Sequence, residues 1–343
     1  MSEPLVTIVV VPRERFSVTR RALEALYAST PRPFRLVYVD GGSPARIRRY
    51  LAAEARSRGF ELVRTERHLV PNEARNIGLR RVRTRYVVFI DNDAIPAPGW
   101  LERMVECAEE TGAWVVGPLY LVGEPDRQEI HMAAGDAGIE ERPEGRRFFE
   151  RHRFTGKRLD EVREHLARTP CGQVEFHCML VRATAFERLG PLDEAMMNMA
   201  EHSDLCLLVR HAGGEVYFEP TATVTYITSG RFRWSDYRYF LRRWSEAWTD
   251  ATVAHFRAKW ALGADDPVTA SFRPFVTAQR QFPTIDRVQR ALDRLLGWRM
   301  SRWLGRDVLG RLEIRVNRWW VRVDQARGDH GPIAPVVSHR AGL

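Results

Sequence analysis

The fold is decided by the stretch YVVFIDNDAIPAPGWL, which occupies residues 86–101. Its first five residues are aromatic or β-branched, as in a strand that is buried on both faces. The run ends on Asp91-Asn92-Asp93 and enters a turn that contains two prolines. A buried strand with this ending places two carboxylates together at one edge of a sheet.

Similar apolar runs precede this stretch, and a helical pattern follows each of them. Strands and helices are expected to alternate in the order 5–11, 17–28, 35–40, 44–58, 61–64, a helix from Asn72, 86–91 and a helix from Pro98. This alternation indicates βαβ units, and therefore a mostly parallel sheet flanked by helices on both faces. We predict a Rossmann-like α/β fold, in which ligands bind outside the carboxyl ends of the strands.

The Asp91-Asn92-Asp93 motif is the first candidate site at these strand ends. Two carboxylates one residue apart on a turn can offer several oxygens to a hard cation. Such a cation, Mg²⁺ or Mn²⁺, also binds diphosphate and neutralises charge on a departing nucleotide. The alternative is an Asx-rich turn that caps the next helix.

Two neighbouring segments could complete a nucleotide site. Asp40 follows the second strand, where a carboxylate can accept from a ribose hydroxyl or a base N–H, although Asp-Gly is also common in ordinary turns. Residues 72–78 open a helix whose N-terminus favours an anion, with Arg75 available for a bidentate phosphate contact. The alternative is a plain helix with a surface arginine.

The rest of the chain is less regular. A strand is expected at 113–122, a long insertion or mobile loop at 124–165, and ordered elements again from residue 174. The expected later elements are strands at 174–181, 215–218 and 222–227, and helices at 183–189, 201–212, 234–261 and 286–304. The last dozen residues are polar and contain proline and glycine, so we expect a flexible tail at 331–343.

Composition excludes several classes of protein. The 343 residues are 44% hydrophobic and 28% charged, which is typical of a globular chain. The four cysteines show no CxxC spacing, so we expect reduced thiols in a cytoplasmic protein rather than disulfides or a zinc knuckle. No window approaches the ~20 apolar residues that cross a bilayer. An acidic middle between two basic flanks also disfavours a nucleic-acid groove.

The combined motifs resemble a known family. VTIVVVP, VYVDGGS, NEARNIGL and YVVFIDNDAIPAPGWL, in this order and spacing, are similar to the nucleotide-binding half of family 2 glycosyltransferases, which have the GT-A fold. VRATAFERLGPLDE at 181–194 and Glu201-His202-Ser203-Asp204 resemble the acceptor half. The resemblance implies a catalytic domain at 1–230, with a nucleotide-sugar half at 1–122 and an acceptor half at 123–230.

The resemblance also implies roles for single residues. Asp40 would contact the uracil or ribose, and Arg75 would lie near the base and phosphates. Asp91 and Asp93 would carry the metal, Mn²⁺ or Mg²⁺, with Asp91 and Asn92 close to the donor. The family's Thr-Tyr-Asn after the first strand is Arg13-Glu14-Arg15 here, so base contacts would differ; Pro12 and Glu14 are the candidates at this position.

Two further departures affect the chemistry. The family's Glu-Asp-x-Asp becomes Glu201-His202-Ser203-Asp204, so His202 stands where the catalytic base is usual; Glu201 and Asp204 are the alternatives. Tyr226 and its neighbours replace the metal-binding histidine that often follows the last strand. The metal would then have fewer protein ligands, or would recruit histidines elsewhere, for which the candidates are His131, His177 and His202. His131 could instead touch the donor sugar or be an ordinary loop residue.

The C-terminal extension at 231–330 is basic and rich in tryptophan. Residues 286–329 hold 11 arginines against six acidic residues, with four tryptophans between them. A cationic amphipathic helix of this kind suits the surface of an anionic membrane, so residues 286–327 could place a cytoplasmic enzyme at its inner face. Packing on the catalytic domain or on a second subunit is the alternative.

We therefore expect a metal-assisted, inverting glycosyltransferase that moves a sugar from a nucleotide-diphosphate sugar to a hydroxyl acceptor. A UDP-sugar is the donor we expect first. The acceptor would be a carbohydrate, a lipid-linked molecule or a small molecule; nucleic acid is not expected, and the sequence leaves the oligomeric state open. A retaining enzyme is the alternative if no competent base remains. The rival function is a degenerate GT-A protein that binds carbohydrate or membrane without transfer.

Overall fold

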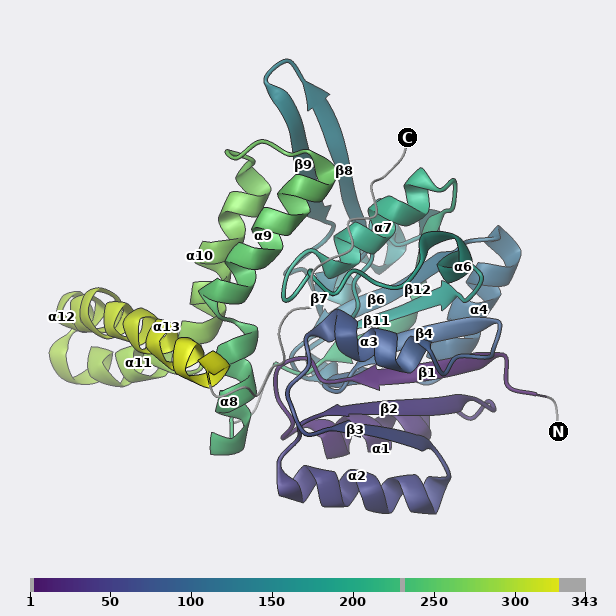
Figure 1. Ribbon diagram of the computed structural model, residues 1–343, viewed down its shortest axis with the longest axis horizontal. Coiled ribbons are helices and arrows are strands. Elements are labelled where there is room, and N and C mark those ends of the chain that lie inside the picture. Colours follow the sequence, from purple (N-terminus) through teal and green to yellow (C-terminus); the bar gives the residue numbers. More distant parts are fainter. Residues whose placement is uncertain (1–2, 229–231, 327–343) are drawn as a thin grey trace.

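The computed structural model describes residues 3–228 and 232–326, and within them ten strands form one mixed sheet (Figure 1). Eight of them follow the order β10-β12-β6-β11-β4-β1-β2-β3, while β5 pairs with β12 and β7 pairs with β6. The strands are β1 (Val6–Val11), β2 (Arg35–Gly41), β3 (Glu61–Thr65), β4 (Tyr86–Asp91), β5 (Ala94–Pro96), β6 (Val115–Val122), β7 (Glu129–Met132), β10 (Thr169–Pro170), β11 (Cys178–Arg182) and β12 (Val216–Tyr226).

The parallel part of the sheet is built from the apolar runs identified in the sequence. Strands β4, β1, β2 and β3 are parallel neighbours, and every residue of β1 and β4 is buried. In this register Val11 pairs with Asp91, so these two strands end at the same edge. The predicted α/β fold with a mostly parallel central sheet is confirmed for this half.

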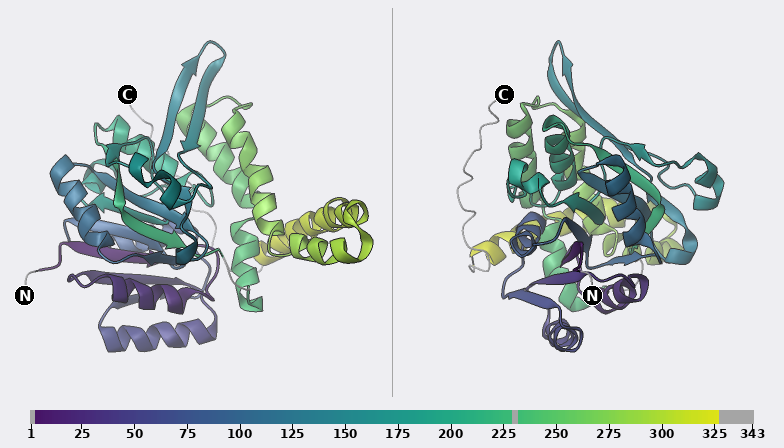
Figure 2. Two further views of the ribbon diagram at one scale, coloured as in Figure 1. Left: turned by 180° about the vertical axis from the view of Figure 1, so that it is seen from behind. Right: turned by 90° about the vertical axis from the view of Figure 1, so that its right-hand side faces the viewer.

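Helices cover both faces of the sheet, as Figures 1 and 2 show. Trp100 in α4 donates to Thr30 at the end of α1 (3.0 Å), so these two helices lie on one face. Asn76 in α3 donates to the carbonyl of Leu192, just after α6 (2.8 Å), which places α3 and α6 together. The helices around the sheet are α1 (Thr19–Ser29), α2 (Ala45–Arg58), α3 (Pro71–Leu79), α4 (Trp100–Thr111), α6 (Ala185–Leu189) and α7 (Glu201–His211).

Helix α3 packs so closely on β1 that Gly78 has no room for a side chain. A Cβ added there would lie 2.2 Å from Cγ1 of Val9. We expect Gly78→Ala to lower the free energy of unfolding by about 1–3 kcal/mol, because the overlap outweighs the better helix propensity of alanine. Urea denaturation measures this, and Val9→Ala in the same chain should recover part of the loss. A Gly78→Ala protein as stable as its parent would contradict the packing.

The prediction that residues 124–165 form a loop is wrong. This segment forms β7, a two-stranded hairpin of β8 (Gly135–Arg142) and β9 (Gly145–His152), the helix α5 (Leu159–Val162), and the short turns η1 (Pro125–Arg127) and η2 (Arg163–His165). A contact with the C-terminal extension stabilises the hairpin. Phe148 packs against Phe256 of that extension, with ring centroids 5.1 Å apart. Its partner lies more than 100 residues away, which local sequence patterns do not reveal.

Several other boundaries differ from expectation. The two strands predicted at 215–218 and 222–227 form the single strand β12, with an irregularity between Glu219 and Thr223. The predicted helix at 234–261 is two helices, because Ser245 caps the second one by accepting from the backbone N–H of Trp248. The C-terminal helices are α8 (Trp234–Arg243), α9 (Glu246–Trp260), α10 (Pro267–Gln281), α11 (Ile285–Leu296), α12 (Trp298–Arg302), the π-helical η3 (Trp303–Gly310) and α13 (Arg311–Ala326).

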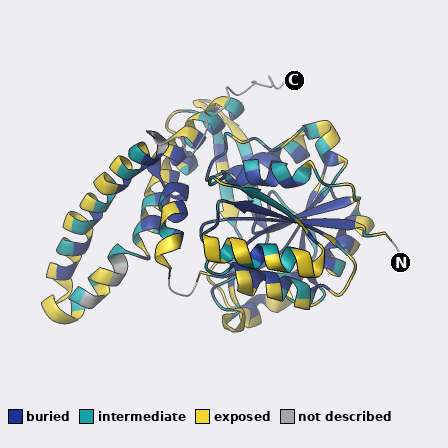
Figure 3. Ribbon diagram, turned by 60° about the horizontal axis from the view of Figure 1, so that its bottom comes forward, coloured by how far each residue is buried: buried dark blue, intermediate teal, exposed yellow. Residues whose placement is uncertain are grey.

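The C-terminal helices divide into a packed part and a projecting part. Helices α8, α9 and α10 lie along the side of the sheet, whereas α11 to α13 extend away from it as an arm (Figure 1). The arm exposes Trp298, Trp303 and Trp319, and Figure 3 shows exposed residues along much of its length. No helix in 3–228 or 232–326 has the length and hydropathy needed to span a membrane. The predicted membrane contact stays a prediction, and the predicted tail at 331–343 lies outside the described residues.

Candidate active site

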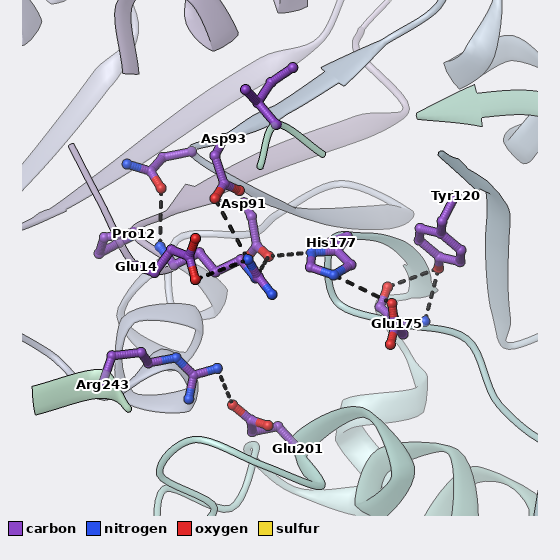
Figure 4. Close-up of polar contacts among 12 residues, drawn as sticks. Pro12, Glu14, Asp91, Asp93, Tyr120, Glu175, His177, Glu201 and Arg243 are labelled. Atoms are coloured by element: carbon purple, nitrogen blue, oxygen red, sulfur yellow. Dashed lines mark hydrogen bonds and ion pairs between the residues drawn. The ribbon is translucent and has the colours of Figure 1, made fainter. Parts of the chain in front are cut away.

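The order of the strands places Asp91 beside a histidine that comes much later in the chain. Strand β11 runs antiparallel to β4, and Cys178 pairs with Ile90, so His177 falls next to Asp91. The backbone N–H of Asp91 donates to the carbonyl of His177 (3.2 Å), and Nδ1 of His177 lies 3.0 Å from Oδ2 of Asp91 (Figure 4). The register of β11 therefore adds an imidazole to the carboxylate pair.

Asp93 is a buried carboxylate that accepts no hydrogen bond within the described part of the chain. Neither of its oxygens, nor Oδ1 of Asp91, accepts a hydrogen bond from the described residues. The guanidinium of Arg13 lies 3.8 Å from Asp93 and 3.5 Å from Asp91. Burial raises the pKa of Asp93 to about 7, although the charge of Arg13 opposes this. Unsatisfied carboxylate oxygens of two neighbouring aspartates fit a divalent cation that prefers oxygen ligands.

The ionisation of Asp91 is controlled by its neighbours. Burial acts to raise its pKa, but the hydrogen bond from His177 and the charges of Arg75 and Arg13 outweigh burial and lower the pKa below its usual value. Asp91 therefore remains ionised in the folded protein, whereas Asp93 is held closer to its protonated form. A cation bound by both oxygens would favour the ionised state of Asp93 as well.

Arg75 lies on α3 beside Asp91, and its predicted contact with the donor stays a prediction. It is buried, donates from Nη1 to Oδ1 of Asn72 (3.0 Å), and has Nη2 3.5 Å from Oδ1 of Asp91. Its guanidinium also lies over the ring of Phe176, 3.9 Å from the centroid. The N-terminal turn of α3 thus brings a fixed positive charge to the Asp91–Asp93 centre.

Asp40 and Asn92 lie at the same edge, but their polar atoms are occupied. The two oxygens of Asp40 accept from the backbone N–H and the hydroxyl of Ser43, both at 2.9 Å, and from Arg64. Asn92 accepts from the backbone N–H of Arg13 (3.0 Å) and donates to the carbonyl of Arg15 (2.9 Å). These contacts stabilise the turns after β2 and β1, and direct contact of either residue with a donor stays a prediction.

Helix α8 covers the end of β1 and the loop before α3, which the sequence did not predict. The hydroxyl of Tyr239 lies 3.2 Å from the carbonyl oxygens of both Pro12 and Leu69. Just after α8, Trp244 donates from Nε1 to the carboxylate of Glu14 (3.0 Å). Side chains of the C-terminal extension thus contact both Pro12 and Glu14, and the role of these two residues in donor binding stays a prediction.

His68 is enclosed by the same cover. Its Nδ1 lies 3.2 Å from the carbonyl of Gly41, and its ring contacts that of Tyr239, with centroids 5.1 Å apart. Burial lowers the pKa of His68 to about 4, and the charges of Arg238 and Arg242 act in the same direction.

We therefore expect His68 to destabilise the fold at acidic pH. An unfolded histidine titrates near pH 6.5, so between about pH 6.5 and 4 the unfolded chain binds more protons, and stability falls as the pH falls. His68→Gln should reduce this loss by up to about 3 kcal/mol. Urea denaturation across this pH range measures it, with the exposed His165→Gln as control. Equal pH dependence in His68→Gln and its parent would refute the expectation.

The Glu201-His202-Ser203-Asp204 segment begins α7, and its three candidate bases face different surroundings. Glu201 is buried and pairs with Arg243 (3.1 Å), as Figure 4 shows. Asp204 accepts from Lys259 (2.7 Å) and from Nε1 of Trp260 (2.9 Å), which joins α7 to α9 and favours a structural role. Nε2 of His202 has no hydrogen-bond partner among the described residues.

A group of imidazoles continues from His177 away from Asp91. Nε2 of His177 lies 3.4 Å from Oε2 of Glu175, and Nε2 of His131 lies 2.8 Å from the same oxygen. Nε2 of His152 lies 3.8 Å from Oε1 of Glu175. The ring of Tyr226 stacks on His177, with centroids 4.2 Å apart. The sequence had identified His131 and His177 as possible ligands, but Glu175 and His152 were missed, because neither belongs to a recognisable motif.

Comparison with known sequences identifies relatives of this chain. The sequence model of the family described as glycosyl transferase family 2 matches residues 7–190. Over 242 residues the chain is 27% identical to the pre-mycofactocin glycosyltransferase of Mycobacterium tuberculosis (strain ATCC 25618 / H37Rv), covering 70% of this chain and 44% of that protein. It is 26% identical over 287 residues to the uncharacterized protein y4gI of Sinorhizobium fredii, covering 79% of this chain and 30% of that protein. The chain thus spans less than half the length of these curated relatives.

Comparison with solved structures concerns the fold. GalNAc-T7 with UDP, GalNAc and Mn²⁺ is similar with a TM-score of 0.50 and 17% identity, over 79% of this chain and 54% of that chain. The mannosyltransferase PcManGT from Pyrobaculum calidifontis, in complex with GDP-Man and Mn²⁺, is similar with a TM-score of 0.50 and 16% identity, over 94% and 85% of the two chains. Both are glycosyltransferase structures, and the predicted GT-A fold is confirmed.

Proposed function

The chain belongs to glycosyltransferase family 2, and from this premise we propose that it transfers a sugar from a nucleotide diphosphate to a hydroxyl acceptor at the Asp91–Asp93 centre. The observation that carries the proposal is the buried carboxylate of Asp93, whose oxygens lack hydrogen-bond partners among the described residues. Residues 1–122 would bind the donor, residues 123–230 the acceptor, and 231–330 would form a basic helical extension.

The first requirement of this reaction is to neutralise the negative charge on the leaving diphosphate. Asp91 and Asp93 would hold a divalent cation, Mn²⁺ or Mg²⁺, which neutralises negative charge on the diphosphate when bound. Arg75, fixed by Asn72 and Phe176, places a guanidinium at the same point. Preorganised positive charge of this kind favours the transition state, because it needs no rearrangement when the bond breaks.

The acceptor hydroxyl needs a base, and we propose His202. Its Nε2 has no partner among the described residues and so can receive a proton. Glu201 is the alternative, but its carboxylate already pairs with Arg243. Attack by the deprotonated acceptor on the anomeric carbon, opposite the departing diphosphate, would give inversion of configuration. The acceptor would be a carbohydrate, a lipid-linked molecule or a small molecule.

Helix α8 covers part of the expected donor site, so donor binding requires side chains to move. The hydroxyl of Tyr239 contacts the backbone just after β1 and just before α3, at the edge of the sheet where ligands bind in this fold. Arg13 likewise lies beside both carboxylates of the centre. A nucleotide sugar would therefore have to displace the side chains of Tyr239 and Arg13.

The experiment that tests this function is thermal unfolding in the presence of UDP-, GDP- and dTDP-sugars with Mn²⁺ or Mg²⁺. We expect one sugar nucleotide to raise the midpoint only when the cation is present, because a ligand that binds the folded state alone stabilises it. Asp93→Ala should lose this metal-dependent stabilisation. No shift with any donor would favour a degenerate GT-A protein that has lost transfer.

A further inference from the structure

Three side chains from separate elements converge beside the carboxylate centre. His131 lies on β7, His152 ends β9, and Glu175 precedes β11. One ligand atom from each lies within 4.8 Å of the other two. They belong to the segment for which the sequence predicted a loop and to the strand whose register the sequence did not reveal.

The distances among these atoms suit ligands around one ion. Zn²⁺ takes imidazole nitrogen and carboxylate oxygen at about 2.0–2.2 Å in a tetrahedral arrangement, which separates ligand atoms by about 3.3 Å. Nε2 of His131 lies 2.8 Å from Oε2 of Glu175, and Nε2 of His152 lies 3.8 Å from Oε1 of the same carboxylate. Small side-chain rotations would bring both nitrogens and one carboxylate oxygen around a single ion.

The carboxylate of Glu175 is buried but not satisfied. Its Oε2 has no hydrogen bond of acceptable geometry among the described residues, although Nε2 of His131 is only 2.8 Å away. A divalent ion placed between these two atoms would take both of them as ligands. A buried acceptor left in this state costs about 1–3 kcal/mol, which an ion would remove.

The surroundings hold Glu175 in place. The hydroxyl of Tyr120 accepts from the backbone N–H of Glu175 (2.9 Å) and lies 2.8 Å from its carbonyl oxygen, as Figure 4 shows. His177 contacts both Glu175 and Asp91 and so connects the two centres. Fixed neighbours of this kind orient metal ligands and raise affinity.

We propose that His131, His152 and Glu175 form a second divalent-metal site, separate from the all-oxygen Asp91–Asp93 centre and selective for a transition metal such as Zn²⁺. Two imidazoles and one carboxylate favour such ions over Mg²⁺, and leave a fourth position open for water or a substrate oxygen. The site does not depend on glycosyl transfer, because it rests on the geometry of its own side chains.

Metal binding to the full chain tests the proposal without any assay of turnover. Metal-free protein would be titrated with Co²⁺, whose visible absorption reports nitrogen ligation and low coordination number, and with Zn²⁺ in competition. We expect a tetrahedral-type absorption that saturates at one Co²⁺ per chain and is lost when Zn²⁺ displaces the ion. His152→Ala, and independently His131→Ala, should weaken this binding at least about 100-fold, with folding of each variant checked by thermal unfolding.

Two control variants test whether Co²⁺ binds at this site rather than at a surface histidine or at the Asp91–Asp93 centre. His165→Ala removes an exposed histidine of the same segment and should leave Co²⁺ binding unchanged. Asp93→Asn alters the oxygen centre alone and should leave the tetrahedral-type Co²⁺ absorption unchanged. Absence of Co²⁺ binding by the parent chain, equal binding by both His→Ala variants and the parent, or loss of binding in Asp93→Asn alone would each overturn the proposal.

Discussion

Replacing Asp93 with asparagine is expected to lower the rate of glycosyl transfer by about 10²–10³-fold, or more if the cation is lost altogether. The change keeps the shape of the side chain but removes the charge that would hold the cation. Because Asp93 is fully buried and its pKa is raised to about 7, the variant also removes a charge that is costly to bury. We therefore expect its free energy of unfolding to equal or exceed that of the parent.

The control for this prediction is an aspartate outside the site. Asp160→Asn changes an exposed residue that pairs with Arg158, and it should alter neither rate nor stability. Initial rates at saturating donor and Mn²⁺, with urea denaturation of the same preparations, provide both readouts. An Asp93→Asn protein that retains most of the parental rate would refute the assignment of the centre.

Replacing His202 with glutamine is expected to lower kcat by about 10²–10⁴-fold while the donor KM changes little. The reason is that a general base acts on the acceptor hydroxyl in the transition state and contributes little to donor binding. Steady-state rates with varied donor and acceptor separate these two effects. Slow hydrolysis of the donor by water should fall as well, if the same imidazole activates the water.

Glu201→Gln is the matched comparison, because it is one residue away on the same helix. Its carboxylate pairs with Arg243, so this variant should lose less kcat than His202→Gln. Large loss in Glu201→Gln with little loss in His202→Gln would instead identify Glu201 as the base. Equal, small losses in both variants would contradict an inverting mechanism with a base on α7.

The parallel half of the site was predictable from the sequence. Strands β1 and β4 are continuous apolar runs, and parallel neighbours end at the same edge, so their last residues had to meet there. Helix α3 follows β3 after the loop at 66–70, which brings Arg75 to the same edge. These inferences need only local periodicity and the rule that ligands bind at the carboxyl ends of parallel strands.

The remaining parts of the site come from pairings that local patterns do not specify. Glu175 and His177 reach Asp91 because β11 is antiparallel to β4, a direction that an apolar run does not reveal. His152 arrives on a hairpin whose buried face is completed by α9 and α10 of the extension. Tyr239 contacts Pro12 from 227 residues further along the chain. Such contacts depend on tertiary packing, not on propensity.

The choice among the candidate bases could not be made from local sequence patterns either. Successive residues of a helix differ in direction by about 100°, so Glu201 and His202 cannot face the same group. Glu201 contacts Arg243, and His202 lies among Glu150 and His152. The sequence identified the segment, whereas the surroundings of each side chain required the structure.

The central claim is that this chain moves a sugar from a nucleotide diphosphate at the Asp91–Asp93 centre. The most direct test follows the anomeric proton of each UDP-, GDP- and dTDP-sugar by NMR, after reaction with Mn²⁺ or Mg²⁺ and removal of the cation, for the parent and for Asp93→Asn. We predict that the parent consumes one donor in a cation-dependent reaction with inversion at the anomeric carbon, and that Asp93→Asn does not. Consumption of no donor by the parent, or equal consumption by both proteins, would contradict the account.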